Sequence, residues 1–144
     1  MAGALYGGVI LDRFRHPRFF GELPGADLVH EDVNPLCGDR LRVEVRLGPG
    51  GELETVRFQG DACAIATASA DLLAEMVEGR PARDASEVDR EAILGRLGAP
   101  VRPSRLACVN LPVGVLRGAL RAIGGGPGPG ASPDRARGTG GGSR

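Results

Sequence analysis

Three cysteines and one aspartate are the residues whose types and surroundings could do chemistry. Cys37 lies in the stretch "PLCGDR", where a single glycine separates it from Asp39. Free cysteine usually packs as a small hydrophobe, so a Pro/Gly loop with a nearby charge suits a metal ligand better. Cys63 follows Gly and Asp in "GDAC", and Cys108 stands at or near the start of an expected helix. An odd number of cysteines argues against a disulfide framework and favours a reducing cytoplasm.

Together the three thiols and the carboxylate of Asp39 would make a four-ligand set. Zinc or an iron–sulfur cluster accepts such a set, and the carboxylate, as the weaker ligand for a soft metal, would keep the site labile. Each position is expected to expose its sulfur, and the two helix starts should lower the thiol pKa of Cys63 and Cys108. The spacing alone does not show convergence, because no CxxC pair is present. The competing interpretation is three packing cysteines.

The composition excludes several other kinds of function. With 144 residues and a formal net charge of zero, the chain suits one domain and gives no general reason to bind nucleic acid or membrane. The absence of lysine rules out a lysine Schiff base. Uninterrupted apolar runs are much shorter than the roughly 18 residues of a membrane span, and the first residues do not resemble a secretory signal. A cytoplasmic location is therefore expected.

Hydrophobic periodicity predicts an alternation of helices and strands. Strands are expected over residues 26–33, 41–47 and 52–60, with "GPGG" joining the last two as a hairpin. Helices are expected over residues 6–15, 60–80, 84–98 and 106–123. Asp61 is the expected cap of the second helix and Asp84 or Ser86 of the third, while Pro112 is tolerated if the last helix starts close before it.

The remaining polar residues have ordinary structural interpretations. His16 is expected at a solvated helix end and His30 on an exposed sheet position, and Asp71 is expected on a helix surface. The arginines of the middle strand indicate a solvated face. Residues 1–123 are expected to form the domain, and the Gly/Pro-rich residues 124–144 a disordered tail.

At the cysteines the sequence resembles the IscU/SufU (NifU N-terminal) family of iron–sulfur cluster assembly proteins. The matching stretches are "NPLCGDRLRVEVRL", "GDACAIATASADLLAEMVEGR" and, more loosely, "SRLACVNLPVGVLRGAL". With the opening helix, the resemblance covers about residues 4–122. It implies an α+β fold in which a small three-stranded antiparallel sheet packs against helices, the SufE/NifU-like fold, with the cysteines and the aspartate gathered at one end.

The resemblance also implies roles for individual residues. Cys37, Asp39, Cys63 and Cys108 would bind zinc or a nascent [2Fe–2S] cluster. Cys108 would accept persulfide sulfur from a cysteine desulfurase, with Arg105 in support. Further partners would be downstream cluster carriers or apo-proteins, and the chain would be a monomer or a weak homo-oligomer.

Two branches of that family differ next to the third cysteine. The IscU type has histidine directly before it, where this chain has Ala107, whereas the SufU type has an arginine three residues before it, which Arg105 matches. The interval between Cys63 and Cys108 is nevertheless short, as in the IscU type. The sequence leans towards SufU and leaves open whether the protein is a scaffold or a sulfurtransferase. The alternatives are a structural zinc-binding interaction module and, less favoured, a thiol redox protein.

Overall fold

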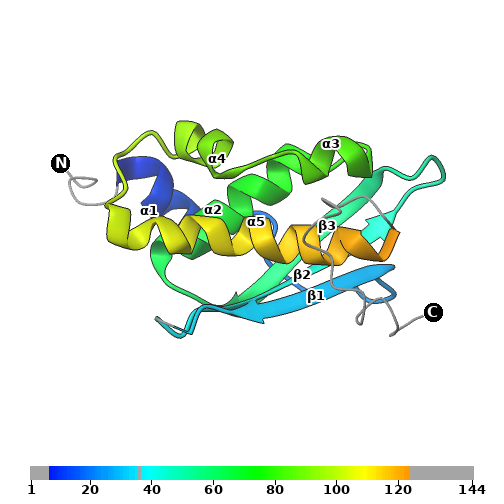
Figure 1. Ribbon diagram of the computed structural model, residues 1–144, viewed down its shortest axis with the longest axis horizontal. Coiled ribbons are helices and arrows are strands. Elements are labelled where there is room, and N and C mark those ends of the chain that lie inside the picture. Colours follow the sequence, from blue (N-terminus) through cyan, green and yellow to red (C-terminus); the bar gives the residue numbers. More distant parts are fainter. Residues whose placement is uncertain (1–6, 36, 124–144) are drawn as a thin grey trace.

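The computed structural model describes residues 7–35 and 37–123, which form an α+β fold with one three-stranded sheet (Figure 1). This arrangement confirms the fold class expected from the sequence. The predicted tail at residues 124–144 lies outside the described residues. The elements, in chain order, are α1 (Gly7–Arg15), β1 (Leu28–Val33), β2 (Arg40–Leu47), β3 (Leu53–Asp61), α2 (Ala64–Val77), α3 (Ala82–Ser86), α4 (Arg90–Leu97), the 3-10 turn η1 (Pro103–Arg105), α5 (Leu106–Leu120) and the 3-10 turn η2 (Arg121–Ile123).

The sheet has the order β1-β2-β3, and both neighbouring pairs are antiparallel. Val43 lies opposite Phe58, and Val45 opposite Val56, so the apolar residues of β2 and β3 share the buried face. The opposite face is only partly wet. There Glu44 is buried, and its Oε1 accepts a hydrogen bond of 2.6 Å from the backbone N–H of Leu23, in the segment that follows α1.

Helices cover the apolar face of the sheet. In Figure 1 the long α5 crosses in front of α2 and the sheet, and it packs on α2, β1 and β2. Val109, Val115 and Leu120 of α5 are fully buried in the core. Burial of this apolar stripe supplies most of the driving force that holds the helix in place. The part of α5 from Val109 onward is thereby fixed relative to the sheet.

The third expected helix, over residues 84–98, is two helices instead of one. Asp89 interrupts it and caps α4, because its Oδ1 accepts a hydrogen bond of 3.2 Å from the N–H of Ala92. Neither Asp84 nor Ser86 serves as the cap. The hydroxyl of Ser86 instead donates back to the carbonyl of Arg83 at 2.8 Å.

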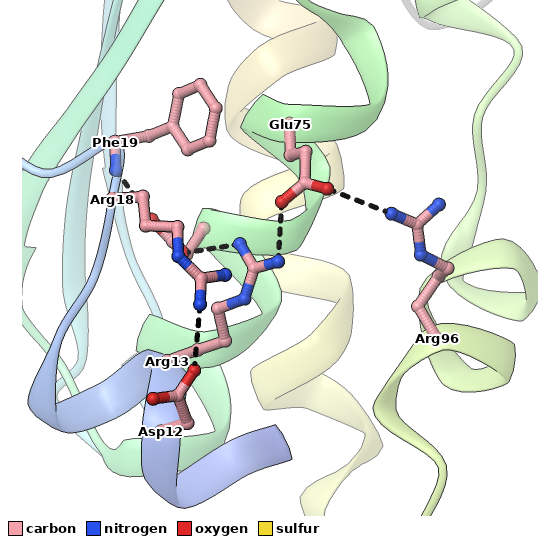
Figure 2. Close-up of polar contacts among 7 residues, drawn as sticks. Asp12, Arg13, Arg18, Phe19, Glu75 and Arg96 are labelled. Carbon is pink, nitrogen blue, oxygen red and sulfur yellow. Dashed lines mark hydrogen bonds and ion pairs between the residues drawn. The ribbon is translucent and has the colours of Figure 1, made fainter.

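Asp71 is fully buried, so its expected place on a helix surface is wrong. Its Oδ2 pairs with Nη1 of Arg13 at 2.8 Å, and its Oδ1 accepts the backbone N–H of Phe19 at 2.7 Å. Arg13 also pairs with Glu75, which in turn pairs with Arg96 at 3.2 Å (Figure 2). Since these residues come from α1, α2 and α4, the network joins three helices. The residues next to Asp71 in the sequence do not indicate its burial, because its partner Arg13 is 58 residues away.

His30 is half-buried, whereas the sequence suggests an exposed position. Its ring lies against Gly118 of α5, where a Cβ would come within 2.5 Å of Cδ2. Glycine at 118 therefore permits the close approach of α5 to β1.

The helical segment Pro103–Ile123 is long and apolar enough to cross a membrane by length and composition alone, with a mean hydropathy of 1.4 in its most apolar window. The sequence-based expectation considered only uninterrupted apolar runs and did not anticipate this. A core helix passes the same test, and 44% of that window is buried against the rest of the chain. One such helix is weak support for a membrane span.

Candidate metal centre

Three segments that are distant in the sequence meet at one end of the molecule, on the left in Figure 1. They are the loop before β2, the turn from β3 into α2, and the first turn of α5. The ligand atoms of Cys37, Asp39 and Cys108 all lie within 4.8 Å of one another. Two sulfurs bound tetrahedrally to one zinc would lie roughly 3.8 Å apart, given Zn–S distances of about 2.3 Å. A small closure of the three groups would therefore place them around one ion.

Asp39 provides the test of whether a cation fits. Its carboxylate is buried, and Oδ1 accepts a hydrogen bond of 3.0 Å from the backbone N–H of Cys63. Its Oδ2 is buried with no hydrogen-bond partner among the described residues. An unpaired buried carboxylate oxygen is costly, and a metal ion would satisfy it. The two neighbouring sulfurs match the ligand preference of zinc or iron.

A tight turn carries Cys37 back over Asp39. The N–H of Gly38 donates to the carbonyl of Asn34 at 2.7 Å, and the N–H of Asn34 donates to the carbonyl of Asp39 at 2.7 Å. Gly38 has a φ of +78°, which side chains rarely adopt, so glycine is needed between the two ligands. The one sequence signal for the role of Asn34 is the Asn-Pro dipeptide, a known turn signal.

Cys63 caps α2, because its Sγ accepts a hydrogen bond of 3.4 Å from the N–H of Ala66. The expected cap, Asp61, is instead the last residue of β3. Cys63 is half-buried, and it lies close enough to Cys108 to raise the pKa of that thiol. It lies outside the group whose ligand atoms are all within 4.8 Å. The structure thus brings three of the predicted ligands together and places the fourth beside them.

Cys108 is buried, with an exposed fraction of 2%, so the expectation of an exposed sulfur is wrong for this residue. Burial raises the pKa of its thiol to about 12, helped by the nearby Cys63 and opposed by Arg105. The expected lowering by the helix start is therefore outweighed by desolvation in the metal-free protein. A bound cation favours the thiolate, because metal ligation displaces the thiol proton.

Arg105, to which the resemblance assigns a supporting role, lies beside Cys108. Its Nη1 is 4.0 Å from the Sγ of Cys108, one helical turn further along. The guanidinium carries a permanent positive charge, so it would stabilise negative charge that develops on this sulfur. The group can therefore hold a soft cation and also support sulfur-centred chemistry at Cys108.

Comparison with known proteins places the chain in a family. The NifU-like N terminal domain matches residues 5–124 of the chain. The iron-sulfur cluster assembly scaffold protein IscU of Aquifex aeolicus is 33% identical over 117 residues, which span 81% of this chain and 74% of that protein. The zinc-dependent sulfurtransferase SufU of Bacillus subtilis is 31% identical over 124 residues, which span 74% of this chain and 83% of that protein.

Solved structures agree with the sequence comparison. The crystal structure of a SufU from the thermophile Fervidobacterium islandicum AW-1 superimposes with a TM-score of 0.70 at 26% identity, covering 83% of this chain and 99% of that one. The N-terminal part of a NifU-like protein from Brucella abortus shares the fold, with a TM-score of 0.65. The resemblance noted in the sequence is confirmed: the chain belongs to the NifU-like N-terminal domain family, which includes IscU and SufU proteins.

Proposed function

We propose that this protein works in iron–sulfur cluster assembly in the cytoplasm, accepting sulfane sulfur from a cysteine desulfurase at Cys108. In this proposal Cys37, Asp39, Cys63 and Cys108 hold zinc or a nascent [2Fe–2S] cluster. Two observations carry it: three ligand atoms lie within 4.8 Å of one another, and a buried oxygen of Asp39 has no hydrogen-bond partner in the described part of the chain. The family membership supports the same assignment.

The sulfur step follows ordinary thiol chemistry. The thiolate of Cys108 attacks the terminal sulfur of a persulfide on the desulfurase. A new S–S bond forms at Cys108, the S–S bond of the donor breaks, and the donor cysteine leaves as a thiolate. The Cys108 thiol first gives its proton to water, the donor thiolate takes up a proton from water after it leaves, and the guanidinium of Arg105 stabilises the Cys108 thiolate in between.

The ligand set determines how firmly the cargo is held. Zinc bound here would lower the pKa of the thiols and keep them as thiolates. The carboxylate of Asp39 is a harder ligand than a fourth thiolate, so the site would release its metal or cluster more readily. Cys37 and Gly38 precede β2, so a small shift of Cys37 towards a metal would not require the strand itself to move. These features suit a site that passes its contents on.

The contact between Arg105 and Cys108 supports the SufU-like alternative over pure scaffolding. The SufU of Bacillus subtilis carries the name zinc-dependent sulfurtransferase. Zinc would then be the resident metal and persulfide sulfur the cargo. In the scaffold alternative, iron and sulfur assemble as a cluster on the same four side chains.

One experiment separates these alternatives. Turnover of a cysteine desulfurase is measured without the protein and with its zinc-loaded and zinc-free forms, and persulfide is located by mass spectrometry. Zinc-dependent stimulation with persulfide on Cys108 is the expected result. Ferrous iron and cysteine are added anaerobically in a parallel sample, where cluster absorbance would indicate scaffolding.

Two variants sharpen the readout. Cys108→Ser should abolish persulfide formation, while Asp12→Ala, which alters only an exposed ion pair with Arg18, should leave it unchanged. Unchanged turnover, no persulfide and no cluster would overturn the proposal. If the protein then unfolded on removal of zinc, the structural zinc module would be the remaining explanation.

A further inference from the structure

The buried position of Cys108 conflicts with transfer of sulfur between two proteins. Its exposed fraction is only 2%, whereas its neighbour Ala107 is exposed and Leu106 is half-buried. A partner's persulfide can reach the sulfur only if this turn of α5 moves. Because Cys108 is the one buried residue of the turn, outward movement of residues 106–108 would expose little apolar surface.

The start of α5 is weakly tied to the rest of the helix. In a regular α-helix the N–H of residue 112 would bond to the carbonyl of Cys108, but Pro112 has no N–H. The proline ring also crowds that carbonyl, which belongs to the residue four positions earlier. In addition, the N-terminal cap residue, Arg105, makes no side-chain capping bond among the described residues. In this first turn the carbonyls of Arg105, Leu106 and Ala107 can still accept intrahelical α-type bonds, whereas that of Cys108 cannot.

The corresponding part of α2 has none of these weaknesses. Ala70 occupies the position that matches Pro112, and it has an N–H to donate to the carbonyl of Ala66. Cys63 caps the helix with its sulfur, and Asp71 anchors it to α1. The weakness is therefore specific to the helix that carries Cys108.

We propose that Pro112 is a positioning residue that lets Leu106–Cys108 open as a unit and brings the sulfur of Cys108 to the surface. From Val109 onward α5 stays packed, since Val109 and Val115 are fully buried in the core. η1 would move with the turn, because its Pro103 carbonyl accepts the N–H of Leu106. Residues 98–102, which lie between α4 and η1 in neither helix nor strand, would take up the movement. Its purpose in sulfur transfer rests on the proposed function, but the opening itself can be measured without any desulfurase.

The test is the rate at which iodoacetamide alkylates each cysteine of the metal-free, full-length protein, resolved by mass spectrometry at one pH. Pro112→Ala restores the missing hydrogen bond and should slow alkylation of Cys108 at least tenfold. Alkylation of the exposed Cys37 should not change. Gly114→Ala is the matched control, because it also favours the helical conformation but one turn further along. Its Cβ would meet nothing within 4 Å, and the backbone of residue 114 makes no helical hydrogen bond to residues 106–108. It should leave the rate at Cys108 unchanged.

Two outcomes would overturn the proposal. One is an unchanged rate at Cys108 in Pro112→Ala. The other is an equal slowing in both variants, which would mean that the whole of α5 opens. A merely structural role for Pro112 would change the denaturation midpoint without changing the ratio of the Cys108 and Cys37 rates.

Pro112 lines a small apolar space beside Val43 and Leu116, so its substitution can also disturb folding. If Pro112→Ala does not fold, hydrogen exchange of the unsubstituted protein tests the proposal instead. The amides of Asn110 and Leu111 can bond to the first turn of α5, and those of Ala68 and Ser69 hold the same places in α2. Exchange at least tenfold faster in α5 supports the proposal. Equal protection would reject it.

Discussion

The two helix starts that carry cysteines at the candidate metal centre are built differently. Cys63 begins α2 with its sulfur in a capping bond to Ala66, and the helix behind it is anchored by the buried pair of Asp71 and Arg13. Cys108 lies in the first turn of α5, which has no side-chain cap in the described part of the chain and has Pro112 four residues on. One thiol is therefore built into a rigid frame, and the other into a turn that few hydrogen bonds hold.

This difference suggests a division of labour between thiols of the same site. A ligand that also caps a helix cannot move far without breaking that helix. A sulfur that must be exchanged with a partner needs freedom to move. The network in Figure 2 holds the α2 side of the site in place, since it joins α1, α2 and α4.

The largest expected effect comes from removing the buried ion pair that anchors α2 to α1. Asp71→Ala leaves the guanidinium of Arg13 buried beside Glu75 alone, and it removes the acceptor of the Phe19 N–H. The free energy of unfolding should fall by about 3–5 kcal/mol, as for other broken buried ion pairs. Urea denaturation of the metal-free protein measures this. Asp12→Ala, in an exposed pair, should cost at most about 1 kcal/mol; a similar loss in both variants would contradict the anchoring role of Asp71.

Zinc should hold the first turn of α5 as firmly as that of α2, because it would bind both Cys63 and Cys108. At a free concentration one hundred times its dissociation constant, zinc should raise the free energy of unfolding by about 2.7 kcal/mol. Thermal denaturation with and without a chelator measures this. Asp39→Asn keeps the size of the side chain but removes its charge, so most of the zinc-dependent increase should disappear. An increase of the same size in this variant would mean that zinc binds elsewhere.

A smaller effect should separate the capping role of Cys63 from its role as a ligand. In the metal-free protein, Cys63→Ser keeps an acceptor for the N–H of Ala66, whereas Cys63→Ala removes it. The serine variant should be more stable by about 1 kcal/mol, although both lose the metal ligand. The same pair of substitutions at Asp89, the cap of α4, is the control and should show the same order. Equal stability of the two Cys63 variants would show that the sulfur contact does not cap α2.

The smallest effect concerns α5 itself. Gly114→Ala should raise the free energy of unfolding by about 0.8–1 kcal/mol, because a Cβ there meets nothing within 4 Å. Gly118→Ala should gain less or lose stability, because its Cβ would collide with the ring of His30. Differential scanning calorimetry of both variants distinguishes them. If both substitutions raise the free energy of unfolding equally, the close packing of β1 on α5 does not limit the size of the residue at position 118.

Much of this structure could be predicted from local patterns. The alternation in residues 41–47 predicts β2, and "GPGG" predicts the hairpin to β3. The Gly and Asp beside Cys37 predict a turn with a ligand, and Gly38 indeed has a left-handed conformation. Each of these signals involves neighbours in the chain, so the sequence contains the whole interaction.

The errors concern residues whose environment comes from elsewhere in the chain. Asp71 was expected on a surface, but Arg13 and Phe19 enclose it. The thiol of Cys108 was expected to be exposed and acidic, but the packing of α5 buries it and raises its pKa to about 12. Desolvation and ion pairing depend on distant residues, and hydrophobic periodicity does not report them.

By itself, the sequence determined which atoms could bind a metal and which local turns and helices would carry them, because residue type and short-range backbone preference suffice for both. Only the tertiary structure decided how those atoms meet. It placed Cys37, Asp39 and Cys108 within ligand distance, left Cys63 beside them as a helix cap, and buried the sulfur of Cys108. The physical reason is that coordination distances and burial are set by how α2, α5 and the sheet pack together over long separations in the chain.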